Sequence, residues 1–470
     1  MKRKSNFVIL LVFLSFSRLS FAQQNSINTL SLDVFLKMVK QYHPVAKQAE
    51  NIIESAEAKQ LLAKGGFDPK IYYDFKGKVF DGKNYYALND GGFYIPTWFG
   101  LEFKGGLEKN NGYSLNPENT TPTTGNVYSQ ISLPLLQGLI IDERRSTLKQ
   151  ARFFKELSEY DKIVAINELL LKAGKAFWDW HLAYTNLKVY ESAVNLSQVR
   201  FEAVSKTSLL GDRPAIDTVE AGIQLQDRII NLQQARLEYK TKSLMLSNFL
   251  WLENETPIEI NENTVPDKNV LQQDEFTVFF QRVKNIDSII NTHPSLKIYE
   301  FKIKQLQVEE KFKKDKLKPF LRLNYNPLFE PSNFNVNFQD SYKWGLSFGF
   351  PILLRKERGD LQLTKIKIAN TIYENKLKRV ELLNKTKAGI NEYNNYQLQS
   401  NVYSKNVSNY EKLWLSEKKL FENGESSLFM INSREMSYIN AQIKLNEIVN
   451  KNKKAAIETT YLFGVLNMLY

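Results

Sequence analysis

"HPVAKQAENII" (residues 43–53) is echoed later in the chain by "HPSLKIYEFKI" (residues 293–303). Both stretches begin with a His-Pro pair at the head of a helical pattern, although the chain contains only three histidines. The same offset relates Pro69 to Pro319, and each of these prolines precedes a stretch in which apolar and polar residues alternate. The chain therefore contains two related halves.

The correspondence between the halves continues after a change in spacing. "ISLPLLQG" around Pro134 resembles "FGFPILLR" around Pro351, and "LLGDRPAID" around Gly211 resembles "ENGESSLFM" around Gly424. Each half therefore consists of a helix, strands, a long helix, a glycine turn and a returning helix. We assign residues 23–252 to the first repeat, 253–275 to a polar junction with two prolines, and 276–470 to the second repeat.

Two proline-free stretches form the longest predicted elements. They cover residues 144–211 and 358–424, and at about 1.5 Å per residue each helix reaches roughly 100 Å. In the first stretch, apolar residues follow the 3-4 spacing of a coiled-coil seam: Ile163, Ile166, Leu170, Ala173, Phe177, Trp180, Tyr184 and Leu187. Helices of this length need partners along their whole extent. We expect these partners to be the segments 31–64, 212–252, 280–316 and 425–466.

The N-terminus has the pattern of an export signal. A basic start and an apolar core lead to "SFA", a small-residue cleavage site that ends at Ala22. We therefore predict that residues 1–22 are a signal peptide. The formal net charge is +12, but an exported protein meets no nucleic acid in normal service, so we expect no nucleic-acid partner. The chain has no cysteine, which excludes disulfides, cysteine metal sites and a lipid-modified N-terminal cysteine.

Several short segments show the period-two alternation of strands. In "YKWGLSFGF" (residues 342–350), Trp344 and the residues of the same parity are apolar or aromatic, whereas Lys343 and its counterparts are polar or glycine. Apolar-out and polar-in alternation with many aromatics is typical of membrane barrel strands. The candidate strands are 70–80, 96–108 and 127–134 within residues 67–136, and 320–326 and 342–350 within residues 319–352.

The number of strands follows from the position of the helices. The two helices that flank the strands of one half should lie on the same side of a membrane, so each half needs an even number of crossings. The second half offers two strands and the first offers three candidates, of which one does not cross independently. We therefore expect four strands in each chain. Because open sheet edges are not viable in lipid, several chains must share one barrel.

The features of an enzyme are weak in this sequence. "GKVFDGKN" (residues 77–84) approaches a phosphate-binding loop, but Asn84 stands where that motif needs a hydroxyl to bind Mg²⁺. The repeat explains His43 and His293, and packing among aromatics explains His181. We predict no catalytic residue, no cofactor and no metal. The alternatives to a transport protein are an exported enzyme and a structural or adhesive periplasmic coiled-coil protein.

Together these features resemble the TolC-like outer-membrane efflux protein family. The resemblance covers nearly the whole chain after the signal and rests on the duplication, the glycine at each hairpin tip and the prolines at the strand–helix transitions: Pro69, Pro134, Pro319 and Pro351. It implies a mainly α fold with membrane β structure, in which a trimeric 12-stranded outer-membrane β-barrel continues as a long periplasmic coiled-coil tunnel. The implied location is the outer membrane of a Gram-negative bacterium, without a lipid anchor.

The resemblance also assigns a role to the hairpin tips as the periplasmic gate and the docking surface. The residues concerned are Gly211, Asp217, Glu220, Gly424, Glu425, Met430 and Ser433. Asp217 and Glu220 match the two acidic positions of the family's tip motif, whereas Met430 and Ser433 stand at the corresponding positions of the second half. The acidic ring that the family places at the closed entrance is therefore missing there.

Two acids near the second tip are candidate substitutes for that ring. They are Glu425 and Glu435, and we expect both on ordinary solvated helix faces. Because Met430 and Ser433 replace the two acids in the second half, the resemblance does not imply acid-stabilised gating for this chain.

The function that the resemblance implies is passive export through an outer-membrane duct. The duct would belong to a tripartite efflux or type I secretion system, in which an inner-membrane pump supplies the energy through a periplasmic adaptor protein. The expected partners are two further copies of the chain, the adaptor, the pump and outer-membrane lipid. Opening would occur by an iris-like untwisting of the inner hairpins, a shear of packed helices.

Overall fold

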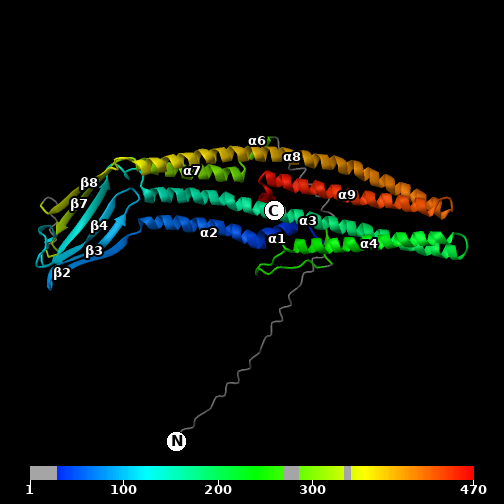
Figure 1. Cartoon of the computed structure of the whole chain (residues 1–470), viewed down its shortest axis with the longest axis horizontal. Coiled ribbons are helices and arrows are strands. Elements are labelled where there is room, and N and C mark those ends of the chain that lie inside the picture. Colours follow the sequence, from blue (N-terminus) through cyan, green and yellow to red (C-terminus); the bar gives the residue numbers. More distant parts are fainter. Residues whose placement is uncertain (1–28, 262, 268–284, 333–339) are drawn as a thin grey trace, which may run out of the picture.

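The structure is a computed structural model that describes residues 29–261, 263–267, 285–332 and 340–470. The molecule is long, with a curled sheet at one end and two helical hairpin tips at the other (Figure 1). The predicted signal peptide (1–22), parts of the predicted junction and second repeat (262 and 268–284) and part of a predicted loop (333–339) lie outside the described residues. In the described part of the chain, no helix has an apolar stretch long enough to cross a membrane.

The helices and strands have the following bounds along the chain. The helices are α1 (Leu32–Tyr42), α2 (Pro44–Lys64), η1 (Gly65–Phe67), η2 (Pro117–Asn119), α3 (Glu143–Leu209), α4 (Ala215–Ser247), α6 (Ile286–Asn291), α7 (Pro294–Asp315), α8 (Arg355–Glu422), α9 (Leu428–Leu462) and α10 (Leu466–Leu469). The strands are β1 (Thr29–Leu30), β2 (Lys70–Phe80), β3 (Lys83–Pro96), β4 (Glu102–Asn111), β5 (Asn126–Pro134), β6 (Val265–Pro266), β7 (Phe320–Phe329) and β8 (Tyr342–Gly349). β1 and β6 form a small parallel pair apart from the main sheet.

The two His-Pro pairs are helix starts. His43 caps α2 and His293 caps α7, and in each case the imidazole Nδ1 accepts the backbone N–H two residues further on at 3.1 Å. Proline then occupies the first helical position, where its missing N–H leaves no hydrogen bond unmade. The sequence echo therefore duplicates one capping arrangement.

Burial favours the neutral form that capping requires, because it lowers the pKa of His43 and of His293. It lowers the pKa of His293 to about 4, with a further contribution from the charge of Lys378 and an opposing hydrogen bond to the Tyr461 backbone. Burial also lowers the pKa of His181 to about 4. A histidine in the unfolded chain has a pKa of about 6.5. The unfolded state therefore binds protons first as the pH falls, and the folded state loses stability from about pH 6.5 down to about pH 4.

We expect His293→Asn to remove part of this pH dependence. Asparagine keeps an acceptor for the N-cap but does not titrate. Between about pH 7.5 and about pH 4.5, the wild-type protein should lose up to about 3 kcal/mol more unfolding free energy than the variant. Thermal melting of both proteins across this range measures the difference. Equal pH slopes would show that His293 does not carry this dependence.

Each long helix ends in a glycine turn. α3 and α8 are 67 and 68 residues long, and Gly211 and Gly424 follow them with φ of 83° and 79°. Glycine adopts this left-handed conformation without steric penalty. At the first tip, the Asp212 N–H donates to the Thr207 carbonyl at 3.0 Å, and the second tip is built in the same way. These bonds satisfy the last helical carbonyls and reverse the chain into α4 and α9.

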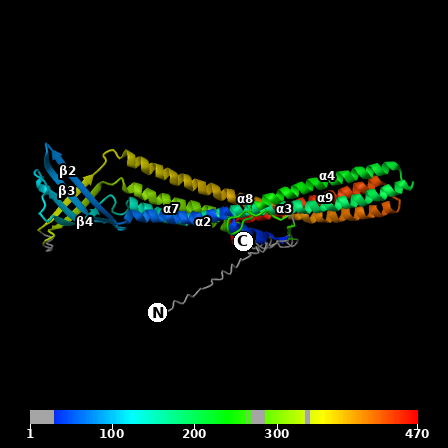
Figure 2. The same cartoon turned by 90° about the horizontal axis from the view of Figure 1, so that it is seen from below.

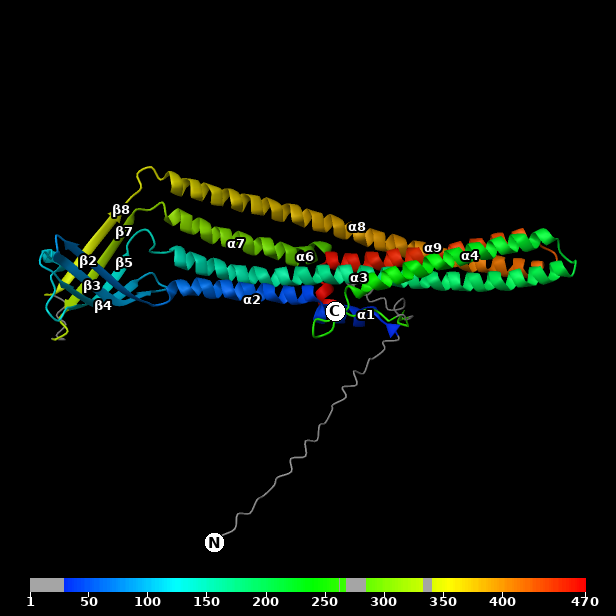
Figure 3. The same ribbon diagram turned by 60° about the horizontal axis from the view of Figure 1, so that its bottom comes forward.

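Each long helix is lined by shorter helices. α2 and α4 both pack along α3, and α7 and α9 both pack along α8. Near the sheet, α2, α3, α7 and α8 follow one another in that order (Figure 3). Toward the tips, the α3–α4 and α8–α9 hairpins lie side by side and touch mainly through α3 and α9 (Figure 2). The outer edges of this helical layer are α2 and α8 near the sheet, and α4 and α8 near the tips.

The largest core lies midway along α3. It contains the buried part of the predicted seam: Ile166, Leu170, Ala173, Phe177 and Trp180. Side chains from α1, α2, α4, α8, α9 and α10 also belong to this core. The Trp180 indole N–H donates to Ser243 of α4 at 3.1 Å, so that a fully buried donor is satisfied. The coiled-coil seam predicted from the spacing is confirmed as the core line of α3.

The main sheet has six strands, so the prediction of four strands per chain is wrong. Their order is β2-β3-β4-β5-β7-β8, and every pair is antiparallel. The predicted strand 96–108 is divided, because β3 ends at Pro96 and β4 begins only at Glu102. Asp81 and Gly82, with φ of 52° and 69°, form the tight turn that joins β2 to β3. The two halves contribute four and two strands, which are both even numbers, as the position of the flanking helices requires.

Candidate functional site

One face of the sheet is apolar and exposed. The ladder register places the following side chains on this face, and they are between 40% and 93% exposed: Ile71, Tyr73, Phe75, Val79, Phe93, Leu107, Ile131, Tyr342, Trp344, Leu346 and Phe348. A sheet in water normally packs such a face against a core. Here no element of the described chain covers it.

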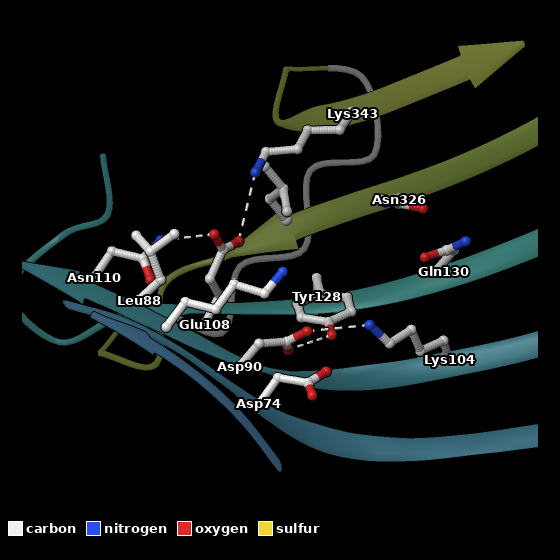
Figure 4. Close-up of a pocket in the computed structure, with 12 residues that line it drawn as sticks. Asp74, Leu88, Asp90, Lys104, Glu108, Asn110, Tyr128, Gln130, Asn326 and Lys343 are labelled. Atoms are coloured by element: carbon white, nitrogen blue, oxygen red, sulfur yellow. Dashed lines mark hydrogen bonds and ion pairs between the residues drawn. The ribbon is translucent and has the colours of Figure 1, made fainter. Parts of the chain in front are cut away.

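The opposite face is polar and lines a cavity of about 280 Å³ (Figure 4). Every strand contributes to the lining, with Asp74 from β2, Asp90 from β3, Lys104 from β4, Tyr128 from β5, Asn326 from β7 and Lys343 from β8. Because side chains from both edge strands line one cavity, the sheet is curled around its polar face.

Asp90 is the centre of a hydrogen-bonded network on the polar face. It accepts from the hydroxyls of Tyr128 at 2.6 Å and Tyr72 at 3.2 Å, and it pairs with the Lys104 ammonium at 3.1 Å. This carboxylate therefore has partners from the strands on either side of β3, all on the polar face. Among the described residues, no group of His, Asp and Glu side chains has an arrangement that could hold a metal ion.

Two glycines make room for this network. Tyr72, Gly92, Gly106 and Tyr128 form one row across four strands. The two tyrosine hydroxyls meet above the glycines, and a Cβ on Gly106 would lie 3.0 Å from one hydroxyl and 3.1 Å from the other. Glycine in a strand marks such close approaches. The tyrosine side chains consequently lie along the wall of the cavity and leave the space in front of the sheet open.

The predicted transition prolines lie where strands and helices meet. Pro69 precedes β2, Pro134 is the last residue of β5, Pro319 precedes β7 and Pro351 follows β8. Proline fits the ends of strands because it cannot donate a ladder hydrogen bond.

An ionic cluster at the junction of the sheet and the helices connects the sheet to α3. Glu102 at the start of β4 pairs with Arg144 of α3, and it pairs with Arg322 of β7 at 3.2 Å. Arg144 also donates to the Tyr94 hydroxyl of β3 at 3.1 Å. Three strands are therefore fixed to the helical layer at this point.

The predicted tip residues all lie at the far end of the two hairpins. Gly211 and Gly424 form the turns, Asp217 and Glu220 are half-buried on α4, Glu425 is exposed beside the second turn, and Met430 and Ser433 are exposed on α9. Asp217 pairs with Arg213 at 3.6 Å, and the Arg213 guanidinium lies 4.2 Å from the centre of the Phe421 ring. Asp217, one of the two acids of the first tip, therefore has a cationic partner within its own chain.

Glu435 does not lie on a solvated face, so that prediction is wrong. Its side chain is 1% exposed and pairs with Arg200 of α3. Arg200 also donates to Asn432 at 2.8 Å, and Asn432 donates to Glu220 at 3.3 Å. Arg228 of α4 is buried beside this pair, where burial lowers its pKa and Glu435 acts against that shift. These five residues form a tip cluster that connects α3, α4 and α9.

Sequence reasoning missed the arginines of the tip cluster. Arg200 stands eleven residues before Gly211, and Glu435 stands eleven residues after Gly424. Because both residues are equally far in sequence from their tip glycines, their side chains lie at the same position along the long axis when the hairpins lie side by side. That spacing could have identified the pair. No comparable signal marks Arg228, because arginine is usually exposed.

Comparison with known proteins identifies the fold from structure alone. Neither a family model nor a curated protein matches the sequence. The CmeC outer membrane channel of Campylobacter jejuni has a TM-score of 0.64 at 14% identity, over 93% of this chain and 86% of that one. The open state of the MtrE outer membrane channel of Neisseria gonorrhoeae has a TM-score of 0.66 at 12% identity, over 93% and 89%.

A third solved structure agrees with these two. The outer membrane protein VceC of Vibrio cholerae has a TM-score of 0.63 at 11% identity, over 92% of this chain and 96% of that one. Identities this low show a shared fold and not a shared activity. The resemblance drawn from the sequence is confirmed at this level: the chain has the fold of the TolC-like outer-membrane efflux channels.

Proposed function

We propose that this chain is one subunit of an exit duct in the outer membrane of a Gram-negative bacterium. The observation that carries the proposal is the sheet, which exposes an apolar face and encloses a polar cavity on the other side. This arrangement suits lipid outside and water inside. The helices would continue the duct into the periplasm, and the structures that share the fold are outer-membrane channels.

The proposed assembly is a homotrimer, because the single chain leaves its edges without partners. Unpaired backbone groups on edge strands would be unsatisfied in lipid. On the outer edge of the helical layer, α4 carries a large apolar residue at every seventh position, between 50% and 69% exposed: Ile216, Ile223, Ile230, Leu237 and Leu244. Such a repeat gives α4 an apolar stripe at one of the two heptad positions of a coiled-coil seam. We assign it to the neighbouring copy of the chain.

α8 carries an exposed apolar seam at the opposite edge. Leu363, Ile366, Tyr373, Leu377 and Val380 keep a 3-4 spacing in which Asn370 is the one polar position, and these five apolar side chains are all exposed in the single chain. Contiguous exposed apolar surface of this kind marks an interface. The α8 seam lies near the sheet, where α2 is the opposite edge and exposes Leu61 and Leu62, whereas the apolar stripe of α4 lies toward the tips. The two edges of each copy therefore differ, so the contact that we propose between copies is head to tail and closes into a ring.

The proposed transport is passive, with energy from an inner-membrane pump that a periplasmic adaptor joins to the duct. The tips around Gly211 and Gly424 are the surface that we propose for adaptor docking. At the entrance, Glu425 is an exposed acid, whereas Glu435 is buried and Asp217 is paired with Arg213. We therefore propose an entrance that opens by helix shear and is not held by an acidic ring.

The native mass of protein extracted from outer-membrane fractions in mild detergent tests this function. We expect a three-chain species that needs detergent to stay in solution. A soluble monomer that needs no detergent would contradict the duct and favour the structural or adhesive coiled-coil protein. A tightly bound organic cofactor in the purified protein would favour the exported enzyme instead.

A further inference from the structure

We infer that β2 of one chain pairs with β8 of the next copy, so that the shared barrel has eighteen strands and not twelve. The inference rests on the proposed three-chain duct, since three chains with six strands each give this number. The interaction surface is the pair of open sheet edges, and the partner is a second copy of this chain.

The directions of the two edge strands fit this pairing. β2 leaves the helical layer after α2, and β8 returns to it before α8 (Figure 1). An even number of antiparallel strands leaves edges that run in opposite directions. The β8 edge of the next copy therefore continues the alternation as one more antiparallel pair, the arrangement of every other pair in the sheet.

The side chains of the two edges also fit. The apolar face is formed at these edges by Ile71, Tyr73 and Phe75 on β2 and by Trp344, Leu346 and Phe348 on β8, which are all exposed. On the polar face, Asp74 and Lys76 of β2 and Lys343 of β8 line the cavity. Pairing β2 with β8 of a neighbour continues both faces without a break.

The two strands beyond the predicted four belong to the wall. β3 and β4 lie between β2 and β5 and are paired on both sides, so they cannot leave without detaching β2. Tyr94 of β3 and Glu102 of β4 both contact Arg144 of α3, which places their turn at the helical end. β3 and β4 are 14 and 10 residues long, and a membrane strand needs about 9–11 residues.

A wider barrel moves the narrowest part of the duct away from the membrane. Barrel diameter grows roughly linearly with strand number, so eighteen strands give a barrel about half again as wide as twelve. Tyr72 and Tyr128 lie flat over Gly92 and Gly106 and do not fill this width. The constriction that selects by size is then in the helical part, toward the tips.

Paired cysteine substitutions test the inference, and the chain has no cysteine of its own. One cysteine replaces Ile71, Tyr73 or Phe75, and the other replaces Trp344, Leu346 or Phe348. Neighbouring antiparallel strands bring Cα atoms to about 5.5 Å, within disulfide range. After oxidation of the detergent-extracted assembly, we expect covalent dimers and trimers from at least one combination. Tyr72→Cys, on the opposite face, is the matched control and should give none.

The same chemistry reports whether β3 and β4 lie in the wall. Ile71 faces Phe93, and Leu107 faces Val127, in the ladder. Double cysteine variants of these two pairs are expected to close disulfides within one chain of the same assembly. A β2–β8 link without these internal disulfides would mean that the β3–β4 hairpin is outside the wall, which would overturn the count of eighteen.

The remaining outcomes separate the inference from the proposed function. A link between Leu107→Cys of β4 and Leu346→Cys of a neighbour, without any link from β2, would overturn the β2–β8 pairing and leave the three-chain duct intact. A trimer that gives neither link would overturn that pairing as well. A protein that is monomeric at extraction and forms no link between chains would overturn the proposed function itself.

Discussion

Leu346→Arg is expected to abolish assembly of the protein in the outer membrane. Leu346 lies near the middle of β8 on the apolar face and is 56% exposed in the single chain. A cationic side chain at the bilayer midplane costs about 2–4 kcal/mol, and three copies bring the total to about 6–12 kcal/mol. This total is comparable with the whole stability of a typical domain, about 5–15 kcal/mol. The measurement is the amount of three-chain species in detergent extracts of outer-membrane fractions.

Gly345→Arg is the matched control for this substitution. Gly345 immediately precedes Leu346 and lies on the opposite, polar face, where an added Cβ meets no atom within 4 Å. The new cation would project toward the polar cavity and stay in water. We expect this variant to assemble as the wild type does. Equal assembly of both arginine variants would show that the apolar face does not meet lipid, and the membrane assignment would then be wrong.

Glu435→Gln is expected to loosen the contact between the two hairpins at the tips. The substitution removes the buried carboxylate that pairs with Arg200, whose side chain is 11% exposed, and the charge that acts on the buried Arg228. Removing one partner of a buried ion pair typically costs about 3–5 kcal/mol. We expect faster amide hydrogen exchange in the last turns of α3 and α8 and the first turns of α9, with little change in the sheet.

Glu425→Gln is the matched control, because Glu425 is exposed beside the same turn. The loss of an exposed charge changes stability by about 0–1 kcal/mol, so its exchange pattern should match the wild type. If Glu435→Gln also exchanges like the wild type, the tip cluster does not hold the hairpins together, and their contact depends on the apolar side chains around Val204 and Ile431.

The helical half of the fold could be predicted because its signals are local and periodic. The seam from Ile166 to Trp180 has the coiled-coil spacing, and the long stretches contain no proline. The tip glycines are also local signals, since Gly211 and Gly424 supply the positive φ that a tight helix ending requires. These features depend on residues within a few turns of one another.

β3 was missed because its centre, "LNDGGF", contains residue types that are depleted in strands. Gly92 is there to accommodate Tyr72, a requirement that exists only once the sheet has formed. A local signal was nevertheless present, because Asp81-Gly82 between alternating segments is a strong hairpin signal. Reading that dipeptide as a turn would have given the first half its fourth strand.

The tip cluster shows the limit of local patterns in a different way. The sequence around Glu435 on its own helix resembles that of a surface position. The residue that pairs with it inside the protein, Arg200, is 235 positions away in the chain. The sequence alone shows that the second tip lacks the two acids of the motif, but it does not show that Glu435 has a partner inside the protein. Only the side-by-side placement of the two hairpins brings these charges together.

An end-on view of the detergent-extracted particle by electron microscopy tests most directly whether this chain builds a duct. We expect a threefold ring of density around an empty centre that continues along the long axis of the particle. A solid rod, or a particle without threefold symmetry, would contradict the claim that this chain builds a duct.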